Sequence, residues 1–229
     1  MKTIGILGGM SAASTQTYYR ELCALTRAQL GGLHSPDLLI RSLDFALIAA
    51  LQKSGDWTTA ATLLNQAAKA LEHGGADMIL LATNTMHKLA EPMMQGVSIP
   101  LLHIADATAQ AITRAGLKRP GLIATAFTME QTFYTTRLTA AGLTPIIPNA
   151  ADRSEIHGVI YDELCRDITT AASEASFIAI TNRLITAGAD SLILGCTEVG
   201  MLLNSQNTPV PVFDTTLIHC AAAIAAALD

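Results

Sequence analysis

Helix-like and strand-like patterns of apolar residues alternate along the chain. Residues 58–75 repeat apolar side chains at the period of a helix and end in two glycines, which predicts an amphipathic helix with a glycine cap. Its apolar face consists of Leu63, Leu64, Ala67, Ala68 and Leu71. The short apolar run that follows, residues 78–81, is typical of a parallel strand that is covered on both faces.

The same succession recurs later in the chain. Residues 177–188 form a second helix that ends in glycine, and its apolar face consists of Phe177, Ile180, Leu184 and Ile185. The apolar run 192–194 follows it. Two further pairs of segments match, 2–9 with 119–126 and 99–106 with 210–216. Because strands and helices alternate throughout, we predict an α/β protein of two pseudo-symmetric, doubly wound domains, each built on a parallel sheet.

The expected N-terminal domain comprises residues 1–100 plus 213–229, and the expected C-terminal domain comprises residues 101–212. Folds of this kind bind ligands beyond the carboxyl ends of their strands. Small or polar residues gather at four of these ends, at 8–11, 83–85, Thr125 and 196–198. If the two halves face each other, these ends converge, so we expect the active site in the cleft between the domains.

Composition and charge exclude several classes of partner. The chain has 229 residues, of which 50% are hydrophobic and 14% charged, which is enough apolar material for a substantial core. A net charge of -5 without a Lys or Arg cluster argues against a nucleic-acid-binding surface. Gly8 and Gly9 interrupt the N-terminal apolar run, and residues 218–228 are too short to span a membrane. We therefore expect a cytoplasmic protein with neither a nucleic-acid nor a membrane partner.

Cysteines and histidines show no metal-ligand spacing. The four cysteines are scattered without a CxxC pair and the six histidines include no HExxH motif, so neither a metal site nor a disulfide framework is predicted. We interpret three cysteines as packing residues in helices: Cys23, Cys165 and Cys220. We interpret four histidines as surface or helix residues: His34, His73, His157 and His219.

Cys196 lies at the end of the second apolar run, after Gly195 and before an expected helix start. A thiol near the N-terminal amides of a helix has a lowered pKa and is a good base. A cysteine in this place can equally be a core residue. The adjoining Thr197 is unusual in a packed core and favours the functional interpretation.

The matching position of the first half, 113 residues earlier, holds Thr83. Thr83, Asn84 and Thr85 could cap the next helix, or they could hold a ligand carboxylate through charge-assisted hydrogen bonds. Two strand ends related by pseudo-symmetry would approach a small ligand from opposite faces. That geometry suits removal of a proton from one face of a carbon and its return to the other.

Six motifs together resemble the aspartate/glutamate racemase family. They are I-G-I-L-G-G-M-S at 4–11, T-N-T-M-H-K at 83–88, H-I-A-D-A-T at 103–108, T-M-E-Q-T-F-Y at 128–134, G-C-T-E at 195–198 and P-V-F-D-T at 211–215. The resemblance implies a small-molecule amino-acid substrate, no metal or organic cofactor, and a homodimer. It also implies two catalytic residues, usually both cysteines, on opposite faces of the substrate α-carbon, and it places these roles at Thr83 and Cys196.

Thr83 departs from the two-cysteine pattern. A hydroxyl is too weak an acid to form an alkoxide near neutral pH, but it can deliver or relay a proton. In the family the second-half base is associated with the L-enantiomer, so the resemblance implies an enzyme that favours L-aspartate or L-glutamate. Because the two enantiomers have equal free energy, this preference must appear in kinetics, binding or exchange.

The same resemblance implies substrate contacts from Met10, Gln52, Asn84, Thr85, Thr197 and Glu198. Gln52 stands where some relatives carry arginine, and it could equally be a solvated helix residue. Glu198 would raise the thiol pKa of Cys196 unless it pairs with the substrate ammonium. Arg166 could reach a substrate carboxylate or pair with a local acid.

Two other functions remain open on the sequence. A single cysteine in the second half also suits the decarboxylases of malonate-type acids in the same superfamily. Alternatively, Thr83 marks a lost activity, and the protein binds an amino acid without catalysing a reaction.

Overall fold

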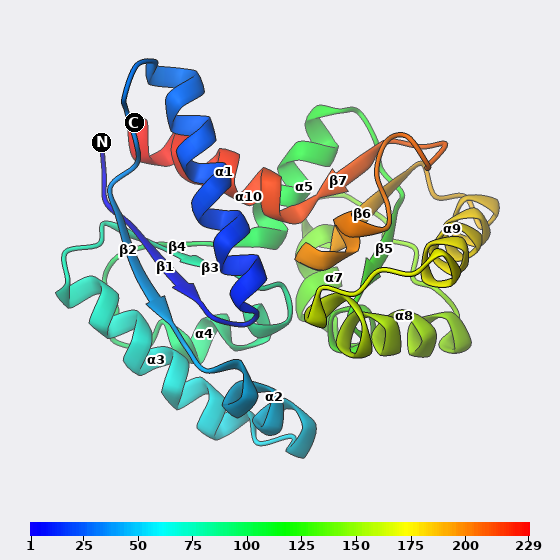
Figure 1. Ribbon diagram of the computed structural model, residues 1–229, viewed down its shortest axis with the longest axis horizontal. Coiled ribbons are helices and arrows are strands. Elements are labelled where there is room, and N and C mark those ends of the chain that lie inside the picture. Colours follow the sequence, from blue (N-terminus) through cyan, green and yellow to red (C-terminus); the bar gives the residue numbers. More distant parts are fainter. The chain divides into compact units, whose positions relative to one another are not determined.

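All strand pairings in the computed structural model, which describes residues 1–229, are parallel, and the strands form two separate sheets (Figure 1). Each sheet belongs to its own unit: unit 1 comprises Met1–His103 and His219–Asp229, and unit 2 comprises Ile104–Ile218. From the sequence we expected the chain to pass from one domain to the other after residues 100 and 212. The second passage lies later, after Ile218, because the strand at Val212–Asp214 pairs within the sheet of unit 2.

Unit 1 is built on a four-stranded sheet with the order β2-β1-β3-β4. Its strands are β1 (Ile4–Gly8), β2 (Leu38–Ser42), β3 (Met78–Leu81) and β4 (Leu101–Leu102). Its helices are α1 (Ala12–Leu30), α2 (Phe45–Ser54), α3 (Trp57–His73), the 3-10 helix η1 (Thr85–Leu89), α4 (Ala90–Met93) and α10 (Thr215–Leu228), the last of which begins in unit 2.

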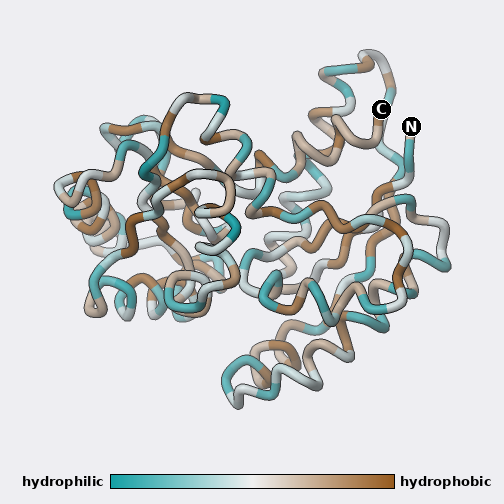
Figure 2. The backbone as a smooth tube through the Cα atoms, turned by 180° about the vertical axis from the view of Figure 1, so that it is seen from behind, coloured by the Kyte–Doolittle hydropathy of each residue, from teal (hydrophilic) through white to brown (hydrophobic).

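The central strands of unit 1 are covered on both faces. Ile4 and Ile6 of β1 pack in one cluster with residues of α1 and α10, whereas Leu7 packs in a second cluster with residues of α2 and α3. The four residues of β3 are all buried and divide between the same two clusters. Figure 2 shows brown, hydrophobic stretches of backbone inside this unit, which is the half that carries both chain ends. The arrangement is the doubly wound unit that the apolar pattern predicts.

Unit 2 is built on a three-stranded sheet with the order β5-β6-β7. Its strands are β5 (Pro120–Ala124), β6 (Ser191–Gly195) and β7 (Val212–Asp214). Its helices are α5 (Ile104–Arg114), α6 (Ala126–Glu130), α7 (Thr132–Ala140), α8 (Ala150–Asp162), η2 (Leu164–Arg166), α9 (Ala171–Thr186) and η3 (Thr197–Met201). One hydrophobic cluster joins these helices to the sheet. No helix in either unit is both long and apolar enough to cross a membrane.

The two sheets share one plan, as the internal repeat predicts. The order β1-β3-β4 in unit 1 corresponds to β5-β6-β7 in unit 2. The first paired residues of the central strands are Met78, opposite Ile4, and Ser191, opposite Pro120. Thr83 and Cys196 each follow that first residue by five positions, so they occupy equivalent places in their own sheets. Strand β2 has only a reduced counterpart, a single parallel bridge between Gly121 and Ile146.

The helices that precede the central strands end in the same way. Helix α3 is followed by Gly75 and helix α9 by Gly188, and both glycines have a φ of 96°. This left-handed conformation is costly for residues with a Cβ atom, which explains the glycine that the sequence places at both points.

His219 is fully buried in α10, unlike the exposed His34 and His73. Its Nε2 lies 2.8 Å from the carbonyl oxygen of Leu102, and its Nδ1 lies 2.8 Å from the hydroxyl of Tyr18. Because a carbonyl can only accept, Nε2 carries the proton and Nδ1 accepts from Tyr18. Burial lowers the pKa of His219 to about 4, so the ring is neutral at pH 7.

We predict that this histidine makes the fold less stable in acid. Between about pH 6.5 and pH 4 the unfolded chain binds a proton that the native ring does not, so the free energy of unfolding should fall by about 3 kcal/mol as the pH drops. Urea unfolding at pH 7, 5.5 and 4 measures this. His219→Asn keeps an acceptor for Tyr18 without a titrating ring and should lose less stability over that range. Equal pH dependence in the two proteins would contradict the assignment.

Candidate active site

The loop after β1 is held in a tight turn. Gly9 has a φ of 85°, and a Cβ atom there would lie 2.1 Å from the carbonyl oxygen of Leu43, so only glycine fits. The amide of Gly9 donates to Thr15 Oγ1 at 2.7 Å, and that hydroxyl donates to the carbonyl of Ser11 at 3.0 Å. The turn leaves Met10 with only 6% of its surface exposed at the start of α1.

Helix α1 joins this loop to the end of β3. Ser11 caps the helix by accepting from the amide of Ser14 at 3.2 Å. The hydroxyl of Ser14 then donates to the carbonyl of Ala82 at 3.1 Å. The loop that carries Met10 is therefore tied to the residue that directly precedes Thr83.

The three polar residues after β3 lie at the carboxyl edge of the sheet. Thr83 is partly exposed, whereas Asn84 and Thr85 have 4% and 5% of their surfaces exposed. Asn84 is the N-cap residue of η1, but its side chain makes no capping hydrogen bond. The side chain of Asn84 therefore does not take the capping role that the sequence left open.

Gln52 is brought to the same edge from α2. Its Nε2 lies 3.0 Å from Sδ of Met86 in η1, and only 6% of its surface is exposed. The alternative of a solvated helix residue is wrong. Unit 1 thus gathers five of the predicted site residues: Met10, Gln52, Thr83, Asn84 and Thr85.

Unit 2 places Cys196 directly beside a carboxylate. The partly buried thiol donates to Oε2 of Glu198 at 3.0 Å, and Glu198 has 6% of its surface exposed. Burial, followed by the charge of Glu198 and this hydrogen bond, raises the pKa of Cys196 well above its ordinary value. The lowered pKa expected from a helix N-terminus is wrong, because η3 is a short 3-10 helix and its amides do not offset burial beside an anion.

Two neighbours of Cys196 were not identified from the sequence. Cys165 lies in the 3-10 helix η2 rather than in an α-helix, and burial together with the charge of Glu198 raises its pKa to about 12. Burial also raises the pKa of Tyr161, and Cys196 contributes to that shift. Only the fold reveals this group, because Cys165 and Tyr161 lie more than thirty positions before Cys196 in the chain.

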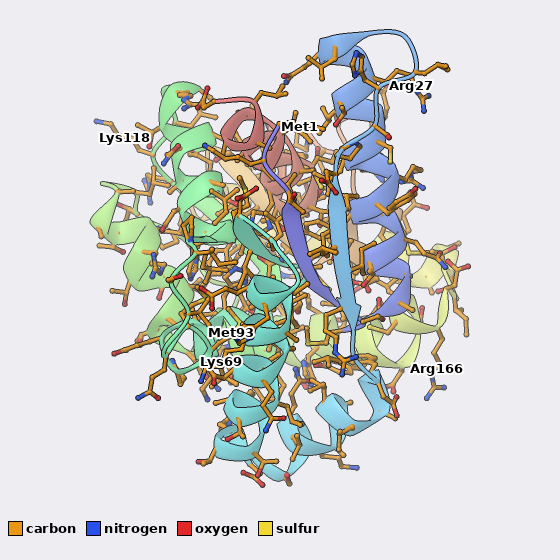
Figure 3. The ribbon with its side chains drawn as sticks, turned by 90° about the vertical axis from the view of Figure 1, so that its left-hand side faces the viewer. Met1, Arg27, Lys69, Met93, Lys118 and Arg166 are labelled. Carbon is orange, nitrogen blue, oxygen red and sulfur yellow. The ribbon has the colours of Figure 1, made fainter.

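Arg166 is exposed in η2 and forms no ion pair with an acidic residue. Figure 3 shows its side chain extending away from the ribbon. The local pairing that the sequence left open is therefore not formed. No group of three or more His, Cys, Asp or Glu side chains is arranged to hold a metal ion.

This chain is similar along most of its length to proteins of one family. The family described as Asp/Glu/hydantoin racemase matches residues 7–223. The chain belongs to this family. The broad specificity amino-acid racemase RacX of Bacillus subtilis is 25% identical over 93% of this chain and 92% of its own length.

Solved structures of the racemase family share the complete fold. A Yersinia pestis structure described as an Asp/Glu racemase is 46% identical, with a TM-score of 0.93 and 100% of both chains covered. An aspartate racemase homologue from Pyrococcus horikoshii OT3 is 31% identical, with a TM-score of 0.87 and the same coverage. The predicted family and α/β fold are therefore confirmed.

We predict that Glu198→Gln makes Cys196 more reactive toward iodoacetamide. Removing the neighbouring negative charge removes one cause of the raised thiol pKa, so alkylation at pH 8 should speed up roughly tenfold. Mass spectrometry of the Cys196 peptide over a pH series measures the rate. Glu174→Gln, which changes an exposed glutamate of α9, should leave it unaltered. An unchanged or slower rate in Glu198→Gln would contradict the electrostatic role of Glu198.

Proposed function

We propose that this protein racemises aspartate or glutamate without a metal or organic cofactor, using Cys196 and Thr83 on opposite faces of the α-carbon. One observation carries the proposal. Thr83 and Cys196 occupy equivalent positions after the central strands of two repeated sheets, in a chain of the racemase family. Removal and return of an α-proton needs one acid–base group for each face of the carbon.

Abstraction from the L-enantiomer is assigned to Cys196. The thiol must first lose its proton, and Glu198, which already accepts its hydrogen bond, provides the nearest acceptor. Alternatively, a substrate ammonium that pairs with Glu198 cancels the charge that raises the thiol pKa. Either route yields a thiolate, which then takes the α-proton and leaves a carbanion.

The polar side chains at the strand ends are assigned to the substrate carboxylates. Hydrogen bonds from Asn84, Thr85 and Thr197 would stabilise the negative charge that spreads onto the α-carboxylate after proton removal. The backbone of Met10 and the amide of Gln52 complete the set. Gln52 carries no charge, so we expect it to orient a carboxylate rather than neutralise it.

Return of a proton to the other face is assigned to the hydroxyl of Thr83. Donation to a carbanion leaves Thr83 as an alkoxide, which regains a proton from water. Abstraction from the D-enantiomer would require that alkoxide to be present beforehand, and it hardly exists at neutral pH. Because the equilibrium constant is one, this weakness slows inversion in both directions. The preference for L-substrates should therefore appear as solvent exchange at the α-carbon that outpaces inversion.

We predict that Cys196→Ala abolishes deuterium incorporation into L-aspartate and L-glutamate in deuterated buffer, because the base of that face is lost. NMR follows loss of the α-proton signal, and circular dichroism confirms folding. Cys165→Ala removes the neighbouring thiol and should retain exchange. Continued exchange in folded Cys196→Ala would reject the assignment.

We also predict that Thr83→Cys raises exchange of the D-enantiomer more than that of the L-enantiomer. A thiol with an ordinary pKa of about 8.5 is partly ionised near neutral pH, whereas a hydroxyl is not. The ratio of the D and L exchange rates is the quantity to measure, and Thr83→Ser, which keeps a hydroxyl, is the matched control. If substrate still binds and the ratio equals that of Thr83→Ser, then residue 83 does not face the α-carbon.

A further inference from the structure

Three buried histidines gather in unit 1 near the end of β3. His87, His103 and His219 have 2%, 6% and 0% of their surfaces exposed. The ring centroid of His87 lies 4.4 Å from that of His103 and 6.0 Å from that of His219. His87 belongs to the T-N-T-M-H-K motif.

The backbone of Thr83 is held at both of its polar groups. Its amide donates to the carbonyl of Leu81 at 2.8 Å. Its carbonyl lies 2.7 Å from Nδ1 of His87. Because the carbonyl can only accept, Nδ1 of His87 carries a proton and donates it. The side chain of Thr83 therefore extends from a peptide segment that is fixed on either side.

The equivalent carbonyl in unit 2 is held differently. The carbonyl of Cys196 accepts from the amide of Val199 at 3.1 Å and so begins the 3-10 helix η3. Helix η1 begins one position later, since its first bond runs from the amide of His87 to the carbonyl of Asn84 at 3.1 Å. The carbonyl of Thr83 therefore accepts from the ring of His87, where the carbonyl of Cys196 accepts from the backbone amide of Val199.

This support is specific to the first half of the chain. By the 113-residue offset of the repeat, the position equivalent to His87 is Gly200, which has no side chain to donate. The carbonyl of Thr83 therefore accepts a hydrogen bond from a side chain, whereas the carbonyl of Cys196 accepts one from a backbone amide. The hydrogen bond from His87 is partly buried, which limits competition from water.

We propose that His87 is a positioning residue for Thr83, which directs the hydroxyl at the α-carbon by fixing the peptide that carries it. This inference rests on the proposed function for its catalytic consequence. His87 acts through the carbonyl of Thr83 and not on the substrate. Its loss should impair the step at Thr83 while leaving proton abstraction by Cys196 in place.

The first test is spectroscopic and needs no activity. In a long-range ¹H–¹⁵N spectrum at pH 7, the ring of His87 should carry a proton on Nδ1. His219 should carry its proton on Nε2 and serves as the internal comparison. An unprotonated Nδ1 on His87 would rule out the hydrogen bond to Thr83 and overturn the proposal.

The second test compares inversion with exchange. In deuterated buffer with L-aspartate or L-glutamate, the rate at which the D-enantiomer forms reports Thr83, and deuterium in the recovered L-enantiomer reports Cys196. His87→Leu should lower the ratio of inversion to exchange roughly three- to tenfold, as expected for loss of one hydrogen bond. His87→Asn places an amide donor near the position of Nδ1 and should restore most of the ratio.

The controls separate positioning from general damage. His219→Asn alters the same histidine cluster without touching Thr83 and should keep the wild-type ratio. Equal loss of inversion and exchange in His87→Leu, without recovery in His87→Asn, would reduce His87 to a packing residue and overturn the proposal. If His87→Leu does not fold, His87→Gln moves the donor to the Nε2 position and gives the same comparison.

Failure of the proposed function has a different signature. If the wild-type protein exchanged no α-proton of either enantiomer of aspartate or glutamate, racemisation would be rejected together with the catalytic role of His87. The tautomer measurement would still decide whether the hydrogen bond to Thr83 exists.

Discussion

The parallel register of the two central strands determines where the reactive side chains lie. In each sheet the fifth residue after the first paired position emerges beyond the carboxyl edge, and these residues are Thr83 and Cys196. A slip of one residue would turn every side chain of β3 to the opposite face, where it would meet the other of the two packed clusters. The fit of these side chains to their own clusters therefore fixes the register, and with it the position of the residue beyond the strand end.

The residues around Cys196 and those around Thr83 give these two side chains different acid–base surroundings. Burial and the carboxylate of Glu198 keep Cys196 protonated, so the resting protein holds a thiol and not a thiolate. Such a thiol is protected from alkylation and oxidation, which both require the thiolate. At Thr83 the acid–base group is intrinsically weak, and the surrounding hydrogen bonds hold its peptide in place.

Some of this organisation was predictable and some was not, for physical reasons that particular residues make clear. Strand β3 coincides with the predicted run Met78–Leu81, because burial on both faces leaves a continuous apolar signal. The burial of Gln52 and the charged surroundings of Cys165 could not be predicted, because they depend on residues distant in the chain, Met86 and Glu198. The raising effect of Glu198 on the pKa of Cys196 could be predicted from its place two residues along the chain, whereas the burial that contributes most to the raised pKa could not.

The repeated architecture also explains how the two half-sites can differ without a change of fold. Threonine and cysteine are close in size, and each follows a strand whose residues are all buried. Exchanging a thiol for a hydroxyl at such a position alters acid strength by many orders of magnitude, while the two sheets keep the same strand pairing. The supporting residues can then diverge independently, with Glu198 beside the thiol of Cys196 and His87 on the backbone carbonyl of Thr83. Under the proposed function both directions of racemisation pass both positions, so the weaker acid would limit inversion equally for the two enantiomers, and only exchange at a single face would distinguish them.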